Sequence, residues 1–362
     1  MPDWVNFKIH GQIPNECGII IIRISNVVEK FKIMKKPCTC MLLALLGILF
    51  LLITGCAPAS PYREDFFAMD TYMTITVYGK QAEQAAGACI AEIRRLDAIF
   101  DKNKPDSEIY RLNHAEGQAL AVQPEVLELL EVSQTCAQQT GGKFDPTIEP
   151  VSSLWNIHSG QGHVPTQGEL EAALQKVGWD KLALTQNTAQ LLDGAQLDLG
   201  GIAKGYAADR AAAILQEYGV ERAVLSLGGN VYVLGQRDKK TLWKVGIQDP
   251  DDKTRTRGTL SVRDCSVVTS GDYERYFEQD GVRYHHIFDP ADGFPGDTGV
   301  RSVTVVCDSS TKADAYSTAL FLMGPEQGME FYRTQGGFEA VFLLSDGTVL
   351  CTDGIASSFS LS

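Results

Sequence analysis

The segment Leu197-Asp198-Leu199-Gly200-Gly201-Ile202-Ala203-Lys204-Gly205-Tyr206 predicts the end of a strand, a double-glycine turn and the first turns of a helix. Glycines at such a turn adopt positive φ and let the backbone come close to a ligand. The helix behind them begins with unpaired N–H groups and a partial positive charge, which together favour a phosphate group. Gly200 and Gly201 therefore indicate a phosphate-binding turn, with Asp198 before it and Lys204 one turn into the helix.

Neither common nucleotide-binding motif accounts for this turn. A Walker A loop requires Lys followed by Ser or Thr after its last glycine, and the dinucleotide fingerprint requires Gly-x-Gly-x-x-Gly. The segment has neither spacing. We therefore expect a ligand that carries phosphate, bound by a turn of another type.

The rest of the chain mixes helices and strands without repeating βαβ units. Apolar periodicity predicts helices over 82–100, 124–140, 167–176, 202–218, 312–323 and 326–334. Alternation and β-favoured residues predict strands over 66–78, 181–184, 190–192, 223–227, 231–234, 242–247, 258–262, 266–269, 284–288, 302–307, 339–344 and 348–351. This order predicts an α+β or irregular α/β fold of two intimately packed lobes.

The N-terminal part predicts an export signal. Met34-Lys35-Lys36 is positively charged, residues 41–53 are almost purely apolar, and Ile53-Thr54-Gly55-Cys56 follows. This is the anatomy of a secretory signal, and a Cys after Thr-Gly resembles a bacterial lipobox, with lipid on Cys56. The alternative is a transmembrane anchor, but the run is shorter than the about 20 apolar residues that span a membrane.

The chain therefore divides into four expected parts. We expect residues 1–33 to be an extension wrongly added before a start at Met34, and residues 34–55 to be a lipoprotein signal peptide. Residues 56–65 are then the lipidated cysteine and a tether, and residues 66–362 form the functional domain. This arrangement predicts a protein held by lipid on the extracytoplasmic face of the bacterial cytoplasmic membrane.

Composition limits the classes of partner. The formal net charge is −13 at pH 7, which argues against nucleic acid because its partners need a basic face. The cysteines that follow Cys56 lack the spacing of a zinc site and indicate small buried side chains: Cys89, Cys136, Cys265, Cys307 and Cys351.

A pair of histidines provides a candidate general base. His285 and His286 lie in a predicted strand before an Asp-Pro turn. Adjacent side chains on a strand point to opposite faces, so the two cannot chelate one metal. The inward histidine is a candidate base, and the alternative is a core histidine bonded to the backbone.

Asp314 and Thr318 provide a candidate cation site. They are four residues apart on a predicted helix and therefore share a face. A carboxylate beside a hydroxyl suits Mg²⁺, which takes one or two carboxylates and substrate phosphate oxygens. The alternative is an acidic residue placed near a helix start to match the helix dipole.

In order and spacing, these segments resemble the ApbE family of FAD:protein FMN transferases, also described as flavin-trafficking lipoproteins. The resemblance runs from about Phe67 to the C-terminal hairpin. The motifs that carry it are Ala68-Met69-Asp70-Thr71, Gly142-Lys143-Phe144-Asp145-Pro146-Thr147, Asp198-Leu199-Gly200-Gly201-Ile202-Ala203-Lys204-Gly205, Ser226-Leu227-Gly228-Gly229-Asn230, His286-Ile287-Phe288-Asp289-Pro290 and Asp314-Ala315-Tyr316-Ser317-Thr318.

The resemblance implies a ligand cleft between the two lobes and a set of site residues. His286 corresponds to the base that takes the proton of the acceptor hydroxyl. The positions expected to contact FAD are Met69, Asn103, Lys143, Phe144, Asp145, Asp198, Lys204, His286 and Ile287. The positions expected at Mg²⁺ are the carbonyl of Gly201, Asp314 and Thr318, with Ser317 nearby. The chain departs from the family twice: Asp70 replaces a usual Gly, and Asn103 stands where an aromatic residue is common.

The resemblance also implies a reaction. FMN passes from FAD to a Thr hydroxyl of an exported partner, with Mg²⁺ bound and AMP released. The implied partners are exported flavin-accepting subunits of membrane electron-transfer complexes. Two alternatives remain: a Mg²⁺-dependent FAD pyrophosphatase that yields FMN and AMP, and a non-enzymatic FAD-binding lipoprotein. The pairing of Asp314 with Thr318 and the presence of His286 favour turnover over storage.

Overall fold

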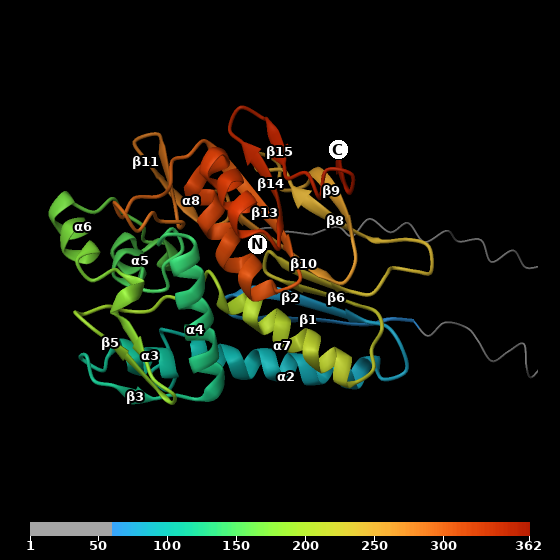
Figure 1. Ribbon diagram of the computed structural model, residues 1–362, viewed down its shortest axis with the longest axis horizontal. Coiled ribbons are helices and arrows are strands. Elements are labelled where there is room, and N and C mark those ends of the chain that lie inside the picture. The colour runs from blue at the N-terminus through green and yellow to red at the C-terminus, as the bar shows by residue number, and fades with distance from the viewer. Residues whose placement is uncertain (1–59) are drawn as a thin grey trace, which may run out of the picture. The chain divides into compact units, whose positions relative to one another are not determined.

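The computed structural model describes residues 60–362 (Figure 1). The predicted extension, signal peptide and lipidated Cys56 lie outside the described residues. Among residues 60–362, no helix combines the length and apolar character needed to cross a membrane. The helices are α2 (Ala82–Phe100), α3 (Glu108–Asn113), α4 (Pro124–Gln139), α5 (Glu149–Trp155), α6 (Gln167–Leu174), α7 (Ala203–Glu217) and α8 (Ser310–Gln335), with 3₁₀ turns η3 (Ile157–Ser159) and η4 (Trp179–Lys181).

One large sheet organises the fold, and all its neighbouring strands pair antiparallel. Its eight strands follow the spatial order β1 (Tyr62–Ala68), β2 (Thr71–Val77), β6 (Ala223–Leu227), β7 (Asn230–Leu234), β10 (Cys265–Gly271), β13 (Val300–Cys307), β14 (Glu339–Leu344) and β15 (Val349–Cys351).

Three smaller sheets complete the structure. One has the order β16 (Phe359–Leu361), β9 (Thr256–Val262) and β8 (Trp243–Gln248). A second has the order β3 (Leu120–Ala121), β5 (Thr188–Leu191) and β4 (Leu182–Leu184). The third is a hairpin of β11 (Tyr276–Gln279) and β12 (Val282–His285).

The large sheet separates two hydrophobic cores. Helices α2, α7 and α8 contact one face, where Val268 of β10 joins the main core. The next side chain back, Val267, points to the other face and joins the second core, with residues of the β16–β9–β8 sheet. Ser266 and Ser270 share the face of Val268, because side chains alternate along a strand. The helix face of β10 therefore brings hydroxyl groups against α8.

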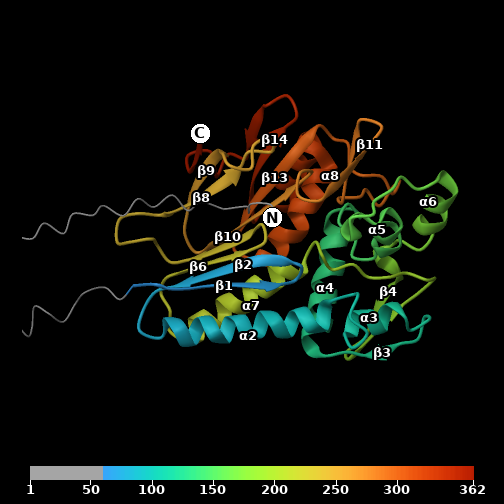
Figure 2. The same ribbon diagram turned by 180° about the vertical axis from the view of Figure 1, so that it is seen from behind.

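A second group of elements lies beside this assembly. In both views, α3 to α6 and the β3–β5–β4 sheet gather at one end of the large sheet (Figures 1 and 2). Leu129 and Leu130 of α4 are fully buried in the same main core as the large sheet. The α+β class is therefore confirmed, and this second group of elements shares one core with the large sheet.

Two predicted strands are wrong in detail. Residues 66–78 form two strands rather than one, because Met69 and Asp70 turn the chain with φ of 48° and 56°. Acidic and amide residues tolerate this left-handed region better than most, so Asp70 can stand at the turn without glycine. The strand predicted over 284–288 ends at His285, so His286 lies in the loop that follows.

Helix α8 covers both C-terminal helices predicted from sequence, and it has a break between them. Gly324 adopts a φ of 72° inside the helix and Pro325 follows it. Pro325 has no N–H to give to the carbonyl of Phe321 four residues earlier. The hydroxyl of Thr298 donates to that carbonyl at 2.8 Å instead. A side chain outside the helix thus satisfies the group that the break leaves free.

Candidate functional site

The double-glycine turn is held by the carboxylate before it. Asp198 Oδ1 accepts a hydrogen bond from the N–H of Gly200 at 2.9 Å, and helix α7 begins at Ala203. Contrary to expectation, neither Gly200 nor Gly201 is among the glycines with positive φ. Gly201 is instead closely surrounded, since a Cβ there would lie in van der Waals contact, 3.4 Å from the ring of Phe144 and 3.5 Å from Thr318 Oγ1.

Three segments of the chain therefore meet at Gly201. Phe144 comes from the loop after α4, Gly201 from the turn before α7, and Thr318 from α8. Phe144 is buried, and its N–H donates to Thr140 Oγ1 at 3.2 Å. The structure thus brings together Phe144, Gly201 and Thr318, which the sequence predicted as one site.

The predicted cation ligands lie on one side of α8. Asp314 is buried, and its Oδ2 accepts the N–H of Gly205 at 2.9 Å. Ser317 Oγ lies 2.9 Å from the Asp314 carbonyl and 2.8 Å from Ser270 Oγ. Ser270 Oγ also lies 3.4 Å from Thr318 Oγ1. Ser270 was not predicted as a site residue from the sequence.

The atoms that could bind a cation at this position are all oxygens. Within residues 60–362, no group of three or more His, Cys, Asp or Glu side chains could hold a metal. A cation at this position would therefore rest on one carboxylate, from Asp314, with a carbonyl and hydroxyl oxygens. That set suits Mg²⁺, which keeps several waters or substrate oxygens and needs few protein ligands.

A partly buried lysine links Asp198 to a second carboxylate. Lys102 Nζ lies 2.7 Å from Asp198 Oδ2 and also forms an ion pair with Glu149 at the start of α5. Ser152 Oγ donates to the same Asp198 oxygen at 3.1 Å. The sequence missed Lys102 and Glu149, because they are 96 and 49 residues before Asp198 and no motif joins them.

Asp198, Lys102 and Glu149 differ in the direction in which the fold shifts their pKa values. Burial opposes ionisation of Asp198, but Lys102 and the N–H of Gly200 outweigh it, and the pKa of Asp198 is lowered. Burial opposes the charge of Lys102 too, yet the two carboxylates raise the pKa of its ammonium. Burial and the neighbouring Asp198 raise the pKa of Glu149 to about 7. Asp198 therefore carries the permanent negative charge, and Glu149 is the carboxylate that takes up a proton near neutral pH.

The two adjacent histidines have different environments. His285 is buried, with Nε2 3.1 Å from the Gly296 carbonyl and Nδ1 accepting the N–H of Ile287 at 3.2 Å. This is the backbone-bonded core histidine of the alternative interpretation. His286 is half-buried, and its Nδ1 lies 3.2 Å from the carbonyl of Arg275. Desolvation, with His158 and Arg275 nearby, lowers the pKa of His286 to about 3.

A sequence profile of the ApbE family matches residues 69–342 of the chain. The chain belongs to the ApbE family. The expectation drawn from its motifs is confirmed.

Individual ApbE-family relatives agree with this assignment. A Treponema pallidum protein named FAD:protein FMN transferase is 36% identical over 323 residues, covering 83% of this chain and 89% of the relative. A Klebsiella pneumoniae protein of the same name is 34% identical over 283 residues, covering 77% of this chain and 88% of the relative. The names of both relatives agree with the transferase enzyme expected from the sequence.

Solved ApbE structures share the fold. The ApbE protein of Thermotoga maritima superposes with a TM-score of 0.78 at 31% identity, covering 83% of this chain and 99% of that one. The apo form of the Pseudomonas stutzeri flavinyl transferase ApbE gives a TM-score of 0.75 at 28% identity, covering 84% of this chain and 98% of that one.

Other ApbE-motif positions lie around the site with partners of their own. Lys143 Nζ forms an ion pair with Asp289 at 2.5 Å, and Lys204 Nζ donates to the Gly200 carbonyl at 2.8 Å. Asp145 is buried and accepts from the N–H groups of Thr147 and Trp179 at 2.8 and 2.9 Å. Asp145 therefore shapes the loop that carries Phe144.

The remaining predicted FAD contacts differ in exposure. Met69 lies in the β1–β2 turn, where its N–H donates to Asp97 Oδ1 at 3.0 Å. Asn103 is exposed, directly after Lys102. Ile287 is buried, and its carbonyl accepts the N–H of Gly296 at 3.0 Å.

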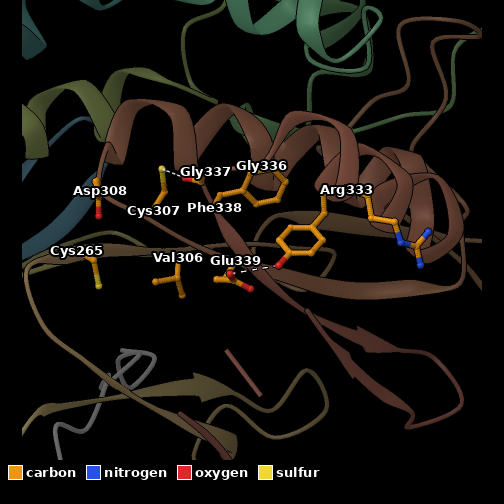
Figure 3. A pocket seen from close by; sticks show the side chains of 10 residues that line it. Cys265, Val306, Cys307, Asp308, Arg333, Gly336, Gly337, Phe338 and Glu339 are labelled. Atoms are coloured by element: carbon orange, nitrogen blue, oxygen red, sulfur yellow. Dashed lines mark hydrogen bonds between the residues drawn. The ribbon is translucent and has the colours of Figure 1, made fainter. Parts of the chain in front are cut away.

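A pocket of about 570 Å³ lies elsewhere, where the last turns of α8 meet β13 and β14 (Figure 3). Its lining includes Cys265, Cys307, Arg333 and Glu339, and no residue of the predicted ApbE site is among its lining residues. The thiol of Cys307 donates to the Gly337 carbonyl at 3.4 Å. This pocket is separate from the site around Gly201.

Proposed function

We propose that this protein transfers FMN from FAD to a threonine hydroxyl of an exported partner protein and releases AMP, with Mg²⁺ bound. The observation that carries the proposal is the meeting of the Gly200–Gly201 turn with the Asp314 and Thr318 face of α8. A helix N-terminus beside a hard-oxygen set is the arrangement that a diphosphate with a divalent cation requires. The names of the relatives support the same reaction.

Different residues would have different roles in binding the diphosphate. Asp198 fixes Gly200, and the N-terminus of α7 and Lys204 supply positive charge next to the turn. Mg²⁺ would be held by the Gly201 carbonyl, Asp314 and Thr318, with Ser317 beside them, and when bound it neutralises charge on the diphosphate.

His286 is the base in this proposal. Its low pKa keeps the imidazole neutral, so a ring nitrogen can accept the proton of the acceptor hydroxyl. The hydroxyl oxygen forms a bond to the phosphorus on the FMN side of FAD, and the bond from that phosphorus to the oxygen of AMP breaks. AMP leaves, and FMN remains on the partner as a phosphoester.

The experiment mixes the purified protein, FAD, Mg²⁺ and an exported acceptor protein with a flavinylation threonine. A covalent gain of FMN on the acceptor, seen by mass spectrometry, supports transfer. Release of FMN and AMP without that gain supports the pyrophosphatase alternative. Unchanged FAD supports the carrier alternative. Replacing the acceptor threonine by valine is the matched control and must abolish the mass gain.

We also propose that Cys56 carries lipid and holds the protein on the extracytoplasmic face of the cytoplasmic membrane. Acceptors on the same face, such as exported subunits of membrane electron-transfer complexes, would then be within reach. Metabolic labelling with palmitate in a bacterial host is expected to label the wild-type protein and not the Cys56→Ser variant. Equal labelling of both proteins would exclude this site.

A further inference from the structure

Arg275 contacts both His158 and His286. Its Nη1 lies 2.5 Å from His158 Nδ1, and its main-chain carbonyl lies 3.2 Å from His286 Nδ1. The N–H of His286 donates to the same carbonyl at 3.2 Å. The two imidazole rings lie 6.0 Å apart, edge to face at 85°. One residue therefore reaches one histidine with its side chain and the other with its backbone.

The partners in these contacts determine which nitrogen of each neutral imidazole ring carries the proton. A guanidinium only donates, so His158 Nδ1 must accept, and the proton of His158 then resides on Nε2. A carbonyl only accepts, so His286 Nδ1 must donate, and Nε2 of His286 is left without a proton. Desolvation lowers the pKa of both rings, so the neutral forms dominate near pH 7.

Arg275 also ties its own hairpin to a distant turn. Its Nη2 donates to the carbonyl of Asp70 in the β1–β2 turn at 3.2 Å. The carbonyl that orients His286 belongs to the residue whose side chain makes this tie. The side chain of Arg275 therefore contacts His158 directly and ties to the β1–β2 turn the residue whose carbonyl orients His286.

We propose that Arg275 is a positioning residue that holds His158 and His286 in opposite tautomers, so that His286 presents a bare Nε2 to the acceptor hydroxyl. The role of His286 in this statement rests on the proposed function. The tautomers do not depend on the proposed function, because they follow from the contacts of Arg275 alone. His158 is a second positioning residue, which anchors the guanidinium through Nδ1.

The first test measures the tautomers by ¹⁵N NMR of histidine-labelled protein, with signals assigned by single His variants. Wild type is expected to show the Nε2–H form of His158 and the Nδ1–H form of His286. Arg275→Met should abolish the single tautomer of His158. Arg283→Met is the matched control, because Arg283 lies on the same hairpin but pairs with Glu278. A His158 signal of the Nδ1–H form in wild type, or one unchanged by Arg275→Met, would overturn the proposal.

The second test measures turnover in three His158 variants. Asn places an oxygen where Nδ1 stands, Gln places one near Nε2, and Leu has no acceptor. A misplaced base costs about tenfold to hundredfold in rate, so Arg275→Met and His158→Leu should lose kcat by that factor with the KM for FAD little changed. His158→Asn should restore most of the rate. Rescue by Gln and not by Asn would assign Nε2 of His158 to the substrate and refute its anchoring role.

The two tests distinguish failure of the proposed function from failure of the proposed role of Arg275. If wild type transfers no FMN but shows the expected tautomers, the proposed function fails and the role of Arg275 stands. If wild type transfers FMN and Arg275→Met is as fast, the role of Arg275 fails alone.

Discussion

Gly205 of α7 and Ser310 of α8 lie so close that a Cβ on Gly205 would be 2.3 Å from the Ser310 carbonyl oxygen. The approach brings the N–H of Gly205 to Asp314, which accepts it at 2.9 Å. The absence of a side chain on Gly205 therefore allows helix α7, which follows the double-glycine turn, to lie close to Asp314 of α8.

Gly205→Ala is expected to lower the free energy of unfolding by about 1–3 kcal/mol, because overpacking forces the two helices apart. Urea denaturation measures the loss. Gly87→Ala is the matched control, since Gly87 lies on the exposed side of α2 with no atom within 4 Å of an added Cβ. That variant should gain about 0.4–1 kcal/mol. Equal stability of the two variants would contradict the close approach.

Asp209 of α7 caps the start of α8 from outside the helix. Its carboxylate accepts the N–H groups of Ser310 and Thr311 at 2.8 and 2.9 Å, and the hydroxyl of Thr311 at 2.7 Å. Asp209→Ala should cost about 1–3 kcal/mol in thermal or urea unfolding, because these donors lose a charged acceptor. Asp209→Asn keeps one acceptor oxygen, so its free energy of unfolding should lie between those of wild type and Asp209→Ala. A loss as large in Asn as in Ala would indicate that charge, and not hydrogen bonding, dominates.

Glu149 makes stability depend on pH. Its pKa rises from 4.5 to about 7 on folding. Between these values the folded protein binds one proton more than the unfolded chain, so stability falls as pH rises, by about 3 kcal/mol in total. Urea denaturation from pH 4 to pH 8 measures this slope. Glu149→Gln should remove it, whereas Glu131→Gln on the exposed side of α4 should keep it.

Asp314→Asn should reduce Mg²⁺-dependent turnover at least about hundredfold, because the carboxylate charge that holds the cation is lost. An asparagine oxygen can still accept the N–H of Gly205, so the fold should persist by circular dichroism. Asp308→Asn, at an exposed position before α8, is the control and should keep full activity. Turnover of wild type that is insensitive to EDTA would contradict a cation at this position.

His286→Ala should lower turnover by about 10²–10⁴ and leave FAD binding intact, as expected for loss of a base. Because the pKa of His286 is about 3, the wild-type rate should not fall through protonation of this ring between pH 8 and pH 5. His114→Ala is the control, since His114 is a histidine stacked on Tyr110 away from these contacts. A pKa near 6.5 in the rate profile that disappears in His286→Ala would contradict the low value.

Long elements were predictable from local pattern alone. The helix over 82–100 and the strand over 223–227 match α2 and β6, because periodic burial of apolar residues fixes both. The turn at Met69 and Asp70 was not predictable in this way, since β-favoured residues flank it and no glycine marks it. Helices α3 and α5 have 6 and 7 residues, too few to show a period.

The residues of the candidate site also differ in how far a local sequence pattern could predict them. Segments rich in glycine, such as the one around Gly201, were visible because close approach restricts the residue types that fit. Lys102, His158 and Arg275 act through contacts across the fold, and a single lysine, histidine or arginine in a loop has no pattern to mark it. Even at Gly201 the predicted positive φ was wrong, and the structure shows a turn packed against Phe144 and Thr318 instead.

The break at Gly324 makes the two halves of α8 separate structural units. The half before it carries Asp314, Ser317 and Thr318, and the half after it contributes Tyr332 and Arg333 to the separate pocket. Because Thr298 satisfies the Phe321 carbonyl at the break, the first half ends as a complete unit. Substitutions in the second half can therefore reshape the pocket while the helical turns that carry Asp314, Ser317 and Thr318 keep their own hydrogen bonds.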